Sequence, residues 1–380
     1  MKKLVFTKDA FVAGENALSY LKELGAKKAV IVTGGKSMFQ TGVIDAAEKY
    51  LKESGCEVAV YSGISKNPTV AQAKEGLACL RREKPDTVVA IGGGSPIDAA
   101  KIMTLFYDFP ELDFDNVFDH DLSSLTLKTQ FVAVPSTSGT ASEVTHVGVI
   151  TYEEKEYKFA IRTEAIRPKV AILDPALPKS LPASVAAETG MDALTHALES
   201  YINKNGNDFT YALSKEAVEG LIEWLPVSVK TGSLESREKV HSFQCMAGMA
   251  FSNSGLGIVH GVSHAFGGKY NLAHGLANAV ILPYSMDYNK KDSNVAEKYK
   301  KLSHILGMDV IEKVKELQRE LNIPACIRDT GIAEDVYRAD YEFLVENSMK
   351  GSTAVNPVPV SFEDMKKFVD CVYYGRKVDF

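Results

Sequence analysis

The sequence predicts an α/β domain with a doubly wound, mostly parallel sheet, followed by an all-α domain. At 380 residues the chain exceeds the size at which one hydrophobic core usually stops growing. Short β-branched runs alternate with helical patterns up to about residue 175, and such runs largely vanish after the prolines at 175–182. We therefore expect a first domain at 1–180 and a second at 181–380.

Five β-branched runs are expected as strands of the first domain. They are apolar throughout, as expected for parallel strands that helices cover on both faces. A helical pattern at 69–82 separates the second run from the third. The runs lie at 29–33, 57–61, 87–91, 131–135 and 170–174. The domain is therefore predicted to be Rossmann-like.

Residues 144–161 interrupt this alternation. T-H-V-G-V-I-T and Y-K-F-A-I flank the polar turn Y-E-E-K-E, which predicts a β-hairpin appended to the sheet. In the second domain, the apolar spacing over 310–321 predicts an amphipathic helix. Ser361 and Asp364 are a candidate capping pair for a last helix.

Composition indicates a soluble cytoplasmic protein. Apolar residues make up 45% and charged residues 24% of the chain. A net charge of -6 argues against a nucleic acid or an anionic membrane as partner, and no apolar run is long enough to span a bilayer. The five cysteines are scattered without a C-x-x-C pair, which favours reduced thiols. The start M-K-K-L-V-F turns polar too early for a signal peptide.

Two helix-spaced residues and a histidine cluster are candidate metal ligands. Asp192 and His196 lie four apart in G-M-D-A-L-T-H-A-L-E, so a helix presents both side chains on one face. His260, His264 and His274 crowd into fifteen residues of a chain that has eight histidines. Carboxylates and imidazoles are ligands for divalent metal ions. The pattern predicts a divalent-metal site in the second domain.

Two loops after predicted strands are candidate phosphate-binding segments. I-G-G-G-S-P-I-D-A-A-K opens a helix, where Ser95 and Pro96 suit the N-cap and N1 positions and free N–H groups would bind a phosphate. A tight turn in which Asp98 completes a capping box is the equal alternative. P-S-T-S-G-T-A-S-E-V-T follows the strand at 131–135. Two such loops at the carboxyl ends of parallel strands favour a nucleotide site.

Four segments together resemble the signatures of the iron-containing (group III) alcohol dehydrogenases, which have a dehydroquinate synthase-like fold. The segments occur in that family's order, and the two-domain layout covers essentially the whole chain. They are G-G-G-S-P-I-D-A-A-K, P-S-T-S-G-T-A-S-E-V-T, D-A-L-T-H-A-L-E and H-G-V-S-H-A-F-G-G-K-Y-N-L-A-H-G. The resemblance implies an NAD(P)-dependent oxidoreductase of small primary alcohols or aldehydes that forms a homodimer.

The resemblance also implies roles for individual residues. Those matching Asp192, His196, His260 and His274 bind one divalent metal, usually Fe²⁺ and sometimes Zn²⁺, in a cleft between the domains. His264 matches a family histidine that lies beside the metal without ligating it, and is the candidate catalytic residue, as an orienting group or proton relay. A purely structural histidine is the alternative. The candidate cofactor residues that match family positions are Asn67, Gly94, Ser95, Ser136, Thr137, Thr140 and Lys158. Gly93 and Asp98 are added because they lie in the same glycine-rich segment as Gly94 and Ser95.

The implied ligand set suits redox chemistry on an alcohol. Three neutral imidazoles and one carboxylate leave a divalent metal a net positive charge and an open position, as a catalytic site requires. The metal would act there as a Lewis acid, while the first domain holds the nicotinamide against the substrate carbon. Such ligation suits both iron and zinc.

The turn after the first predicted strand bears on the choice of cofactor. NAD enzymes commonly place an acidic residue near the adenosine ribose, and in the resembled family that acid follows this strand. In V-T-G-G-K-S-M, Gly35 takes the acidic position, with Lys36 and Ser37 next to it. The missing carboxylate leaves room for a 2′-phosphate and favours NADP(H). NAD(H), with glycines that only shape the turn, is the alternative.

Two other functions compete with this interpretation. A glycerol or polyol dehydrogenase-like member of the same fold would place its metal ligands differently, and a non-catalytic nucleotide-binding module would need no metal. Phe251, Phe266 and Tyr270 are candidates for an apolar substrate wall, with core packing as the alternative. N-P-V at 356–358 departs from the N-P-R that many family members carry.

Overall fold

The computed structural model of the chain describes residues 3–153 and 157–380. The chain divides into two compact units, Met1–Ser180 and Leu181–Phe380. None of the described helices combines the length and the hydropathy that a membrane span would need.

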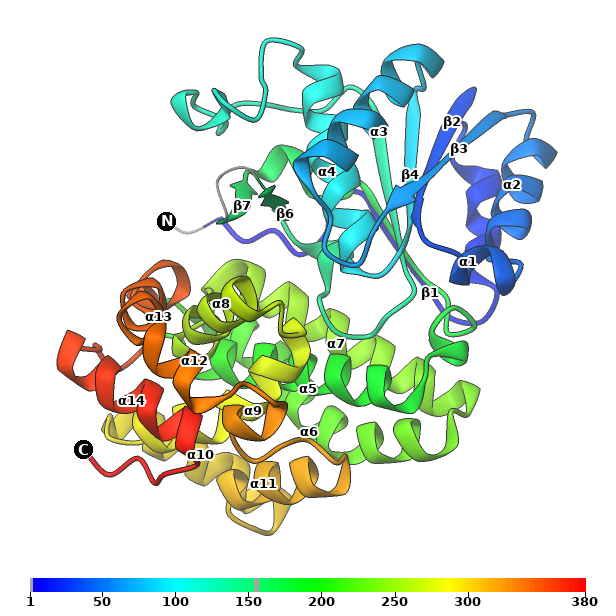
Figure 1. Cartoon of the computed structure of the whole chain (residues 1–380). Helices are drawn as coiled ribbons and strands as arrows, with labels where there is room; N and C mark the ends of the chain where they lie inside the picture. The colour runs from blue at the N-terminus through cyan, green and yellow to red at the C-terminus, as the bar shows by residue number, and fades with distance from the viewer. Residues whose placement is uncertain (1–2, 154–156) are drawn as a thin grey trace. The chain divides into compact units, whose positions relative to one another are not determined.

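A six-stranded parallel sheet forms the centre of the first unit (Figure 1). Its order is β1-β8-β5-β4-β2-β3. The five predicted strands are confirmed, while β1 was not predicted because it is short, has alternate residues exposed and pairs only with β8. The strands are β1 (Ala10–Ala13), β2 (Lys28–Gly34), β3 (Glu57–Ile64), β4 (Thr87–Gly92), β5 (Gln130–Pro135) and β8 (Val170–Leu173).

Helices cover both faces of this sheet, as the apolar strands predicted. Alternate residues of β2 enter different apolar clusters: Val30 and Val32 pack with α3 and α4, whereas Ala29 and Ile31 pack with α2 and the 3-10 helix η1. The sheet is therefore doubly wound. The covering elements are η1 (Ala17–Glu23), α1 (Ser37–Gln40), α2 (Val43–Glu53), α3 (Val70–Glu83) and α4 (Gly94–Asp108).

The predicted hairpin forms, but it is not part of the large sheet. Strands β6 (Val147–Tyr152) and β7 (Tyr157–Arg162) pair antiparallel in a two-stranded sheet of their own (Figure 1). The hairpin packs on α4, so closely that a Cβ on Gly148 would lie 3.1 Å from the carbonyl oxygen of Asp98. The expectation of a hairpin appended to the sheet is therefore wrong in its placement, since glycine lets the strand approach the helix instead.

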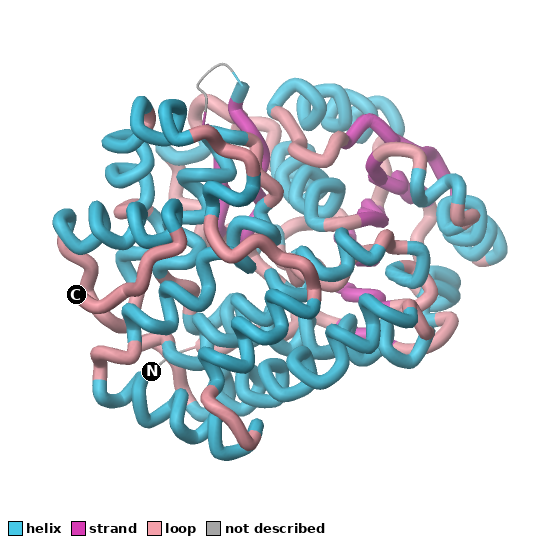
Figure 2. Tube along the Cα trace, turned by 60° about the horizontal axis from the view of Figure 1, so that its bottom comes forward, coloured by secondary structure: helices cyan, strands magenta, loops and turns pink. Residues whose placement is uncertain are grey.

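The second unit is all-helical over its described length, as predicted; strands are magenta in Figure 2 and belong to the first unit. The helix predicted at 310–321 is α11, with Val310 and Val314 buried, and Ser361 caps α14 by accepting from the backbone N–H of Asp364 at 3.0 Å. The helices are α5 (Ala183–Ile202), α6 (Asp208–Thr231), α7 (Leu234–Ser254), α8 (Ile258–Tyr270), α9 (His274–Asn289), α10 (Ser293–Leu306), α11 (Val310–Glu320), α12 (Glu334–Ala339), α13 (Tyr341–Ser348) and α14 (Phe362–Tyr374).

Candidate metal centre and cofactor loops

Helix α5 carries half of the predicted metal site on one face. It is rich in alanine and leucine and almost wholly buried from Gly190 to Ile202, packing against α6, α7 and α9. Asp192 and His196 are one turn apart on this helix, as their spacing predicted. Because the surrounding residues of α5 are buried against other helices, the helix cannot rotate, and the directions of the Asp192 and His196 side chains are fixed.

Helices α8 and α9 bring the remaining histidines. His260 and His264 lie one turn apart on α8, which ends at Asn271 in a left-handed conformation (φ 53°). This sharp stop lets the chain reverse within three residues, so that His274 opens α9. The break between the helices therefore returns His274 to the neighbourhood of His260.

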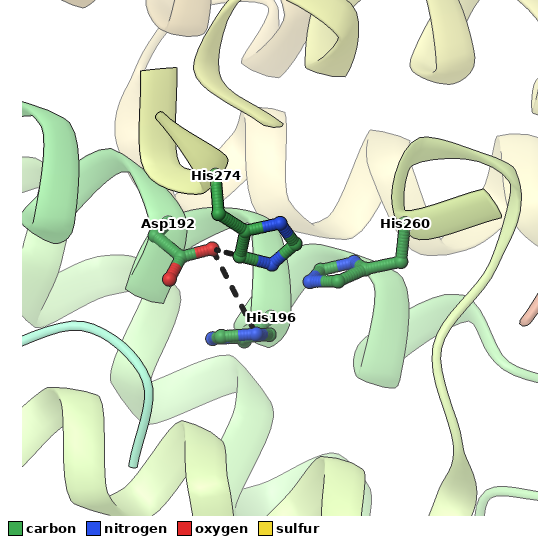
Figure 3. Close-up of side chains that lie close together, drawn as sticks. All are labelled: Asp192, His196, His260 and His274. Carbon is green, nitrogen blue, oxygen red and sulfur yellow. Dashed lines mark ion pairs between the residues drawn. The ribbon is translucent and has the colours of Figure 1, made fainter. Parts of the chain in front are cut away.

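Four of the five candidate ligands converge on one point. One donor atom from each of Asp192, His196, His260 and His274 lies within 4.8 Å of all the others. Asp192 Oδ1 is 3.8 Å from His196 Nε2 and 3.9 Å from His274 Nε2, and Figure 3 shows the four side chains pointing toward one another. Ligands of one ion at about 2.1 Å lie at most about twice that distance apart. The set is thus close to the spacing that a single bound ion requires.

The donor set has the burial and protonation that a divalent cation needs. Asp192, His196 and His260 are at most 4% exposed. The side chain of His274 is 33% exposed, so solvent reaches the donor set at His274. Burial lowers the pKa of His260 well below its usual range, and the neighbouring histidines lower it further, so this imidazole is neutral. Burial raises the pKa of the Asp192 carboxyl, which a bound cation would reverse. The residues therefore fit a divalent metal ion.

Glu199 orients His260 from behind. Its Oε2 lies 2.6 Å from His260 Nδ1, and its Oε1 accepts from the backbone N–H of Val259 at 2.8 Å. Burial raises the pKa of the Glu199 carboxyl, while the N–H groups of Val259, Gly257 and His260 oppose this by favouring the carboxylate. A proton held on Nδ1 leaves the Nε2 lone pair directed at the other ligands. Glu199 is therefore a positioning residue for the site.

Sequence reasoning missed both Glu199 and Asn278. Glu199 stands seven residues after Asp192 and three after His196, so it shares their helix face, and that spacing was the available signal. Asn278, one turn after His274, is fully buried, and its amide nitrogen contacts Asp192 Oδ1 at 2.6 Å. Nothing in the sequence pattern marks an asparagine for that position.

His264 lies beside the cluster and not among the converging donors. Its ring stacks on that of His274 with centroids 5.1 Å apart and lies 6.0 Å from the ring of His260. The side chain is exposed to solvent. This position is compatible with proton exchange between the site and water.

Of the three aromatic residues considered for a substrate wall, one reaches the site. Phe251, at the end of α7, stacks on His196 with ring centroids 4.4 Å apart. Phe266 is fully buried and packs on Tyr337 and Tyr270, so the core alternative holds for Phe266 and Tyr270. Asn356 of N-P-V accepts from the backbone N–H of Ile258 and thereby anchors the start of α8.

In the first unit, the two predicted phosphate-binding loops lie against each other. Strands β4 and β5 are neighbours, with Gly92 opposite Pro135, so both loops leave the same edge of the sheet. A Cβ on Gly93 would lie 3.3 Å from the Thr137 side chain, and one on Gly94 would lie 2.8 Å from that of Thr140. The glycines thus let the two loops meet, and Ser136 closes the turn by donating its N–H to Gly92 O at 2.8 Å.

The helix start in the first loop differs from the prediction. Helix α4 has Gly93 as N-cap without a side-chain cap, so Ser95 and Pro96 are not N-cap and N1, and Asp98 completes no capping box. Ser95 Oγ instead donates to the carbonyl of Lys66. Asp98 accepts from Ser142 Oγ and from the N–H of Val149, which ties α4 to the second loop and to β6. Gly92, the last residue of β4, has a positive φ (150°) that glycine tolerates, and α4 begins two residues later at Gly94.

The remaining cofactor candidates lie near the same edge. Gly35 has a φ of 50° in the turn after β2, and Lys36 and Ser37 follow it, all three exposed. Asn67 is exposed in the segment that Ser95 contacts through Lys66. The backbone of Lys158 pairs with Thr151, but its side chain lies outside the described residues.

Comparisons with known proteins agree over both units. The family model for iron-containing alcohol dehydrogenases matches residues 2–175, and the model for the C-terminal part of that family matches residues 186–373. The NADPH-dependent butanol dehydrogenase of Clostridium saccharobutylicum is 40% identical over 392 residues, covering 100% of both chains. The 1,3-propanediol dehydrogenase of Klebsiella pneumoniae is 38% identical over 90% of this chain and 92% of that protein.

Solved structures share the whole fold. The iron-containing alcohol dehydrogenase from Thermococcus thioreducens superposes with a TM-score of 0.92 at 37% identity, covering 99% of this chain and 100% of that chain. The chain therefore belongs to the iron-containing alcohol dehydrogenase family.

Proposed function

We propose that this alcohol and aldehyde oxidoreductase transfers a hydride between NADP(H) and a small primary alcohol or aldehyde, and that it depends on a divalent metal. The observation that carries the proposal is the convergence of Asp192, His196, His260 and His274 within 4.8 Å. The ligand chemistry suits Fe²⁺ and Zn²⁺ alike, and the family favours Fe²⁺. When bound, the metal supplies Lewis acidity toward the substrate oxygen.

The residues of the second unit have distinct tasks in this proposal. Asp192, His196, His260 and His274 would hold the cation, while Glu199 keeps the Nε2 atom of His260 available for it. In alcohol oxidation the hydride leaves the substrate carbon for the nicotinamide, and the hydroxyl proton leaves for solvent. The exposed ring of His264, which stacks on that of His274, supports a role for His264 in carrying that proton.

The first unit would bind the dinucleotide at the carboxyl edge of its sheet. Gly93 and Gly94 bring the backbone of the α4 start close to Thr137 and Thr140, which supports a pyrophosphate-binding role for both loops. Gly35 offers no negative charge against a 2′-phosphate. The 40% identical relative is named an NADPH-dependent enzyme. Both facts favour NADP(H) over NAD(H).

Steady-state oxidation of NADPH and NADH with short aldehydes such as butanal tests the proposal. We expect turnover with both cofactors and a higher kcat/KM for NADPH. Faster turnover of glycerol or another polyol than of butanol would favour the polyol dehydrogenase alternative. Binding of NADPH without turnover of any substrate would favour a non-catalytic nucleotide-binding module. A homodimer and a cytoplasmic location stay predictions, and sizing of the native protein checks the former.

A further inference from the structure

Asn278 touches three of the four candidate ligands with a single atom. Its Nδ2 lies 2.6 Å from Asp192 Oδ1, 3.1 Å from His260 Nε2 and 3.1 Å from His274 Nε2. The side chain is fully buried on α9, one turn after His274. An amide nitrogen donates and does not accept, and its two hydrogens serve three neighbours. One hydrogen is donated to Asp192 Oδ1, and the other is shared between the Nε2 lone pairs of His260 and His274.

The Oδ1 atom of Asn278 shows how strongly the structure favours Nδ2 on the side of the candidate ligands. Asn278 Oδ1 is buried and has no hydrogen-bond partner among the described residues. A buried unpaired carbonyl oxygen is costly, so the contacts of the amino end must compensate for it. A rotation of the amide by 180° would exchange Nδ2 and Oδ1, and would place the Oδ1 acceptor against the Asp192 carboxylate and the two imidazole lone pairs. The amide is therefore held by its partial positive charge.

A metal ion and the Asn278 amide need the same lone pairs. Each imidazole Nε2 has one lone pair, which either accepts a hydrogen bond or binds a cation. Asp192 Oδ1 keeps further lone pairs, so the conflict concerns His260 and His274. We propose that Asn278 is a positioning residue that stands in for the cation: it holds these donor atoms together in the metal-free protein and must release them when the metal binds. This inference rests on the proposed metal site.

The proposal predicts an unusual sign for a substitution beside a metal site. Loss of a residue that supports bound ligands weakens metal binding, typically by about 10- to 100-fold. Loss of a competitor has the opposite effect. Asn278→Ala, and the bulkier Asn278→Leu that fills the same space without a donor, should bind Zn²⁺ about tenfold more tightly, which corresponds to release of one or two net hydrogen bonds. Both variants should lose more thermal stability without metal than with it.

The experiment uses protein that has been stripped with a chelator and titrated with Zn²⁺ against a chromophoric competitor. Thermal unfolding midpoints are recorded with and without Zn²⁺ for each variant. Gln318→Ala is the matched control. The buried amide of Gln318, on α11, donates to the carbonyl of Ala279, which follows Asn278 on α9, and it has no hydrogen bond to a candidate ligand. It should lower both midpoints alike and leave the dissociation constant unchanged.

Equal or weaker Zn²⁺ binding by both Asn278 variants would overturn the inference, since Asn278 would then be packing or support for the bound ion. Failure of the unsubstituted protein to bind Zn²⁺ or Fe²⁺ would instead overturn the proposed metal site. The two failures are distinguished by the unsubstituted protein alone.

Discussion

Replacement of Glu199 by glutamine should weaken metal binding although all four candidate ligands are kept. Glu199 Oε1 accepts from Val259 N–H at 2.8 Å, and Oε2 lies 2.6 Å from His260 Nδ1, whose proton the carboxylate form accepts. Glutamine has nearly the same shape but one acceptor, so its NH₂ group must face one of these two donors. One of two costs follows from that mismatch.

Both outcomes cost metal affinity. If glutamine keeps the contact with His260, the buried N–H of Val259 loses its partner, at about 1–3 kcal/mol, and the start of α8 shifts. If glutamine instead keeps the contact with the Val259 N–H, its NH₂ group faces His260 Nδ1. The imidazole proton then moves to Nε2, where it opposes the cation. We expect the dissociation constant for Zn²⁺ to rise about 10- to 100-fold, or about 1.4–2.8 kcal/mol.

Competition with a chromophoric chelator measures this constant, and elemental analysis of the purified protein checks the retained metal. Glu219→Gln is the matched control, because Glu219 pairs with Lys215 at 2.7 Å on α6 and has no contact with a ligand. Its metal affinity should equal that of the unsubstituted protein. Glu199→Gln binding within twofold of the unsubstituted protein would refute the positioning role.

Three further predictions concern other residues. His260→Ala should lose both metal and activity, whereas His264→Ala should keep the metal and lose at least about 100-fold in kcat; loss of metal from both, seen by elemental analysis, would contradict the role given to His264. Gly35→Asp should raise the KM for NADPH at least about tenfold with little change for NADH, since a Cβ there meets nothing within 4 Å and aspartate tolerates positive φ; an unchanged ratio would argue against NADP(H) recognition at this turn. Burial lowers the pKa of His241 to about 4 from 6.5, so the unfolded chain binds the proton first and stability falls as the pH drops from about 6.5 to 4. Between pH 7 and pH 5, the free energy of unfolding should fall by about 2 kcal/mol less in His241→Leu than in the unsubstituted protein, as measured by urea unfolding at both pH values. An identical fall in the variant and the unsubstituted protein would refute this.

The sequence predicted most of the regular structure because burial there follows local patterns. Strands β2, β4, β5 and β8 are apolar and buried on both faces, and α11 has a clear apolar stripe. The short β1 has no such pattern, and the position of the β6–β7 hairpin depends on contact with α4, which is a tertiary property. Likewise α4 begins at Gly94 with Gly93 as its N-cap, although Ser95 and Pro96 have stronger local preferences for a helix start.

The candidate site was predictable where spacing alone determines geometry. Asp192 and His196 share a helix face by their separation, and the histidine cluster pointed to the segment that joins α8 to α9. The supporting residues were not predictable in this way. Glu199 and Asn278 act through contacts between α5, α8 and α9, and a carboxylate or amide buried in a helix has no local signature of such a contact.

The most direct test of the central claim is reconstitution of the metal-free enzyme. The protein is purified anaerobically and stripped with a chelator, and Fe²⁺ or Zn²⁺ is then added stepwise while NADPH oxidation by butanal is followed. We expect activity to vanish on stripping and to return in proportion to bound metal, with a break at one ion per chain. Full activity in the stripped protein, or no recovery when one ion is bound, would contradict metal-dependent hydride transfer at Asp192, His196, His260 and His274.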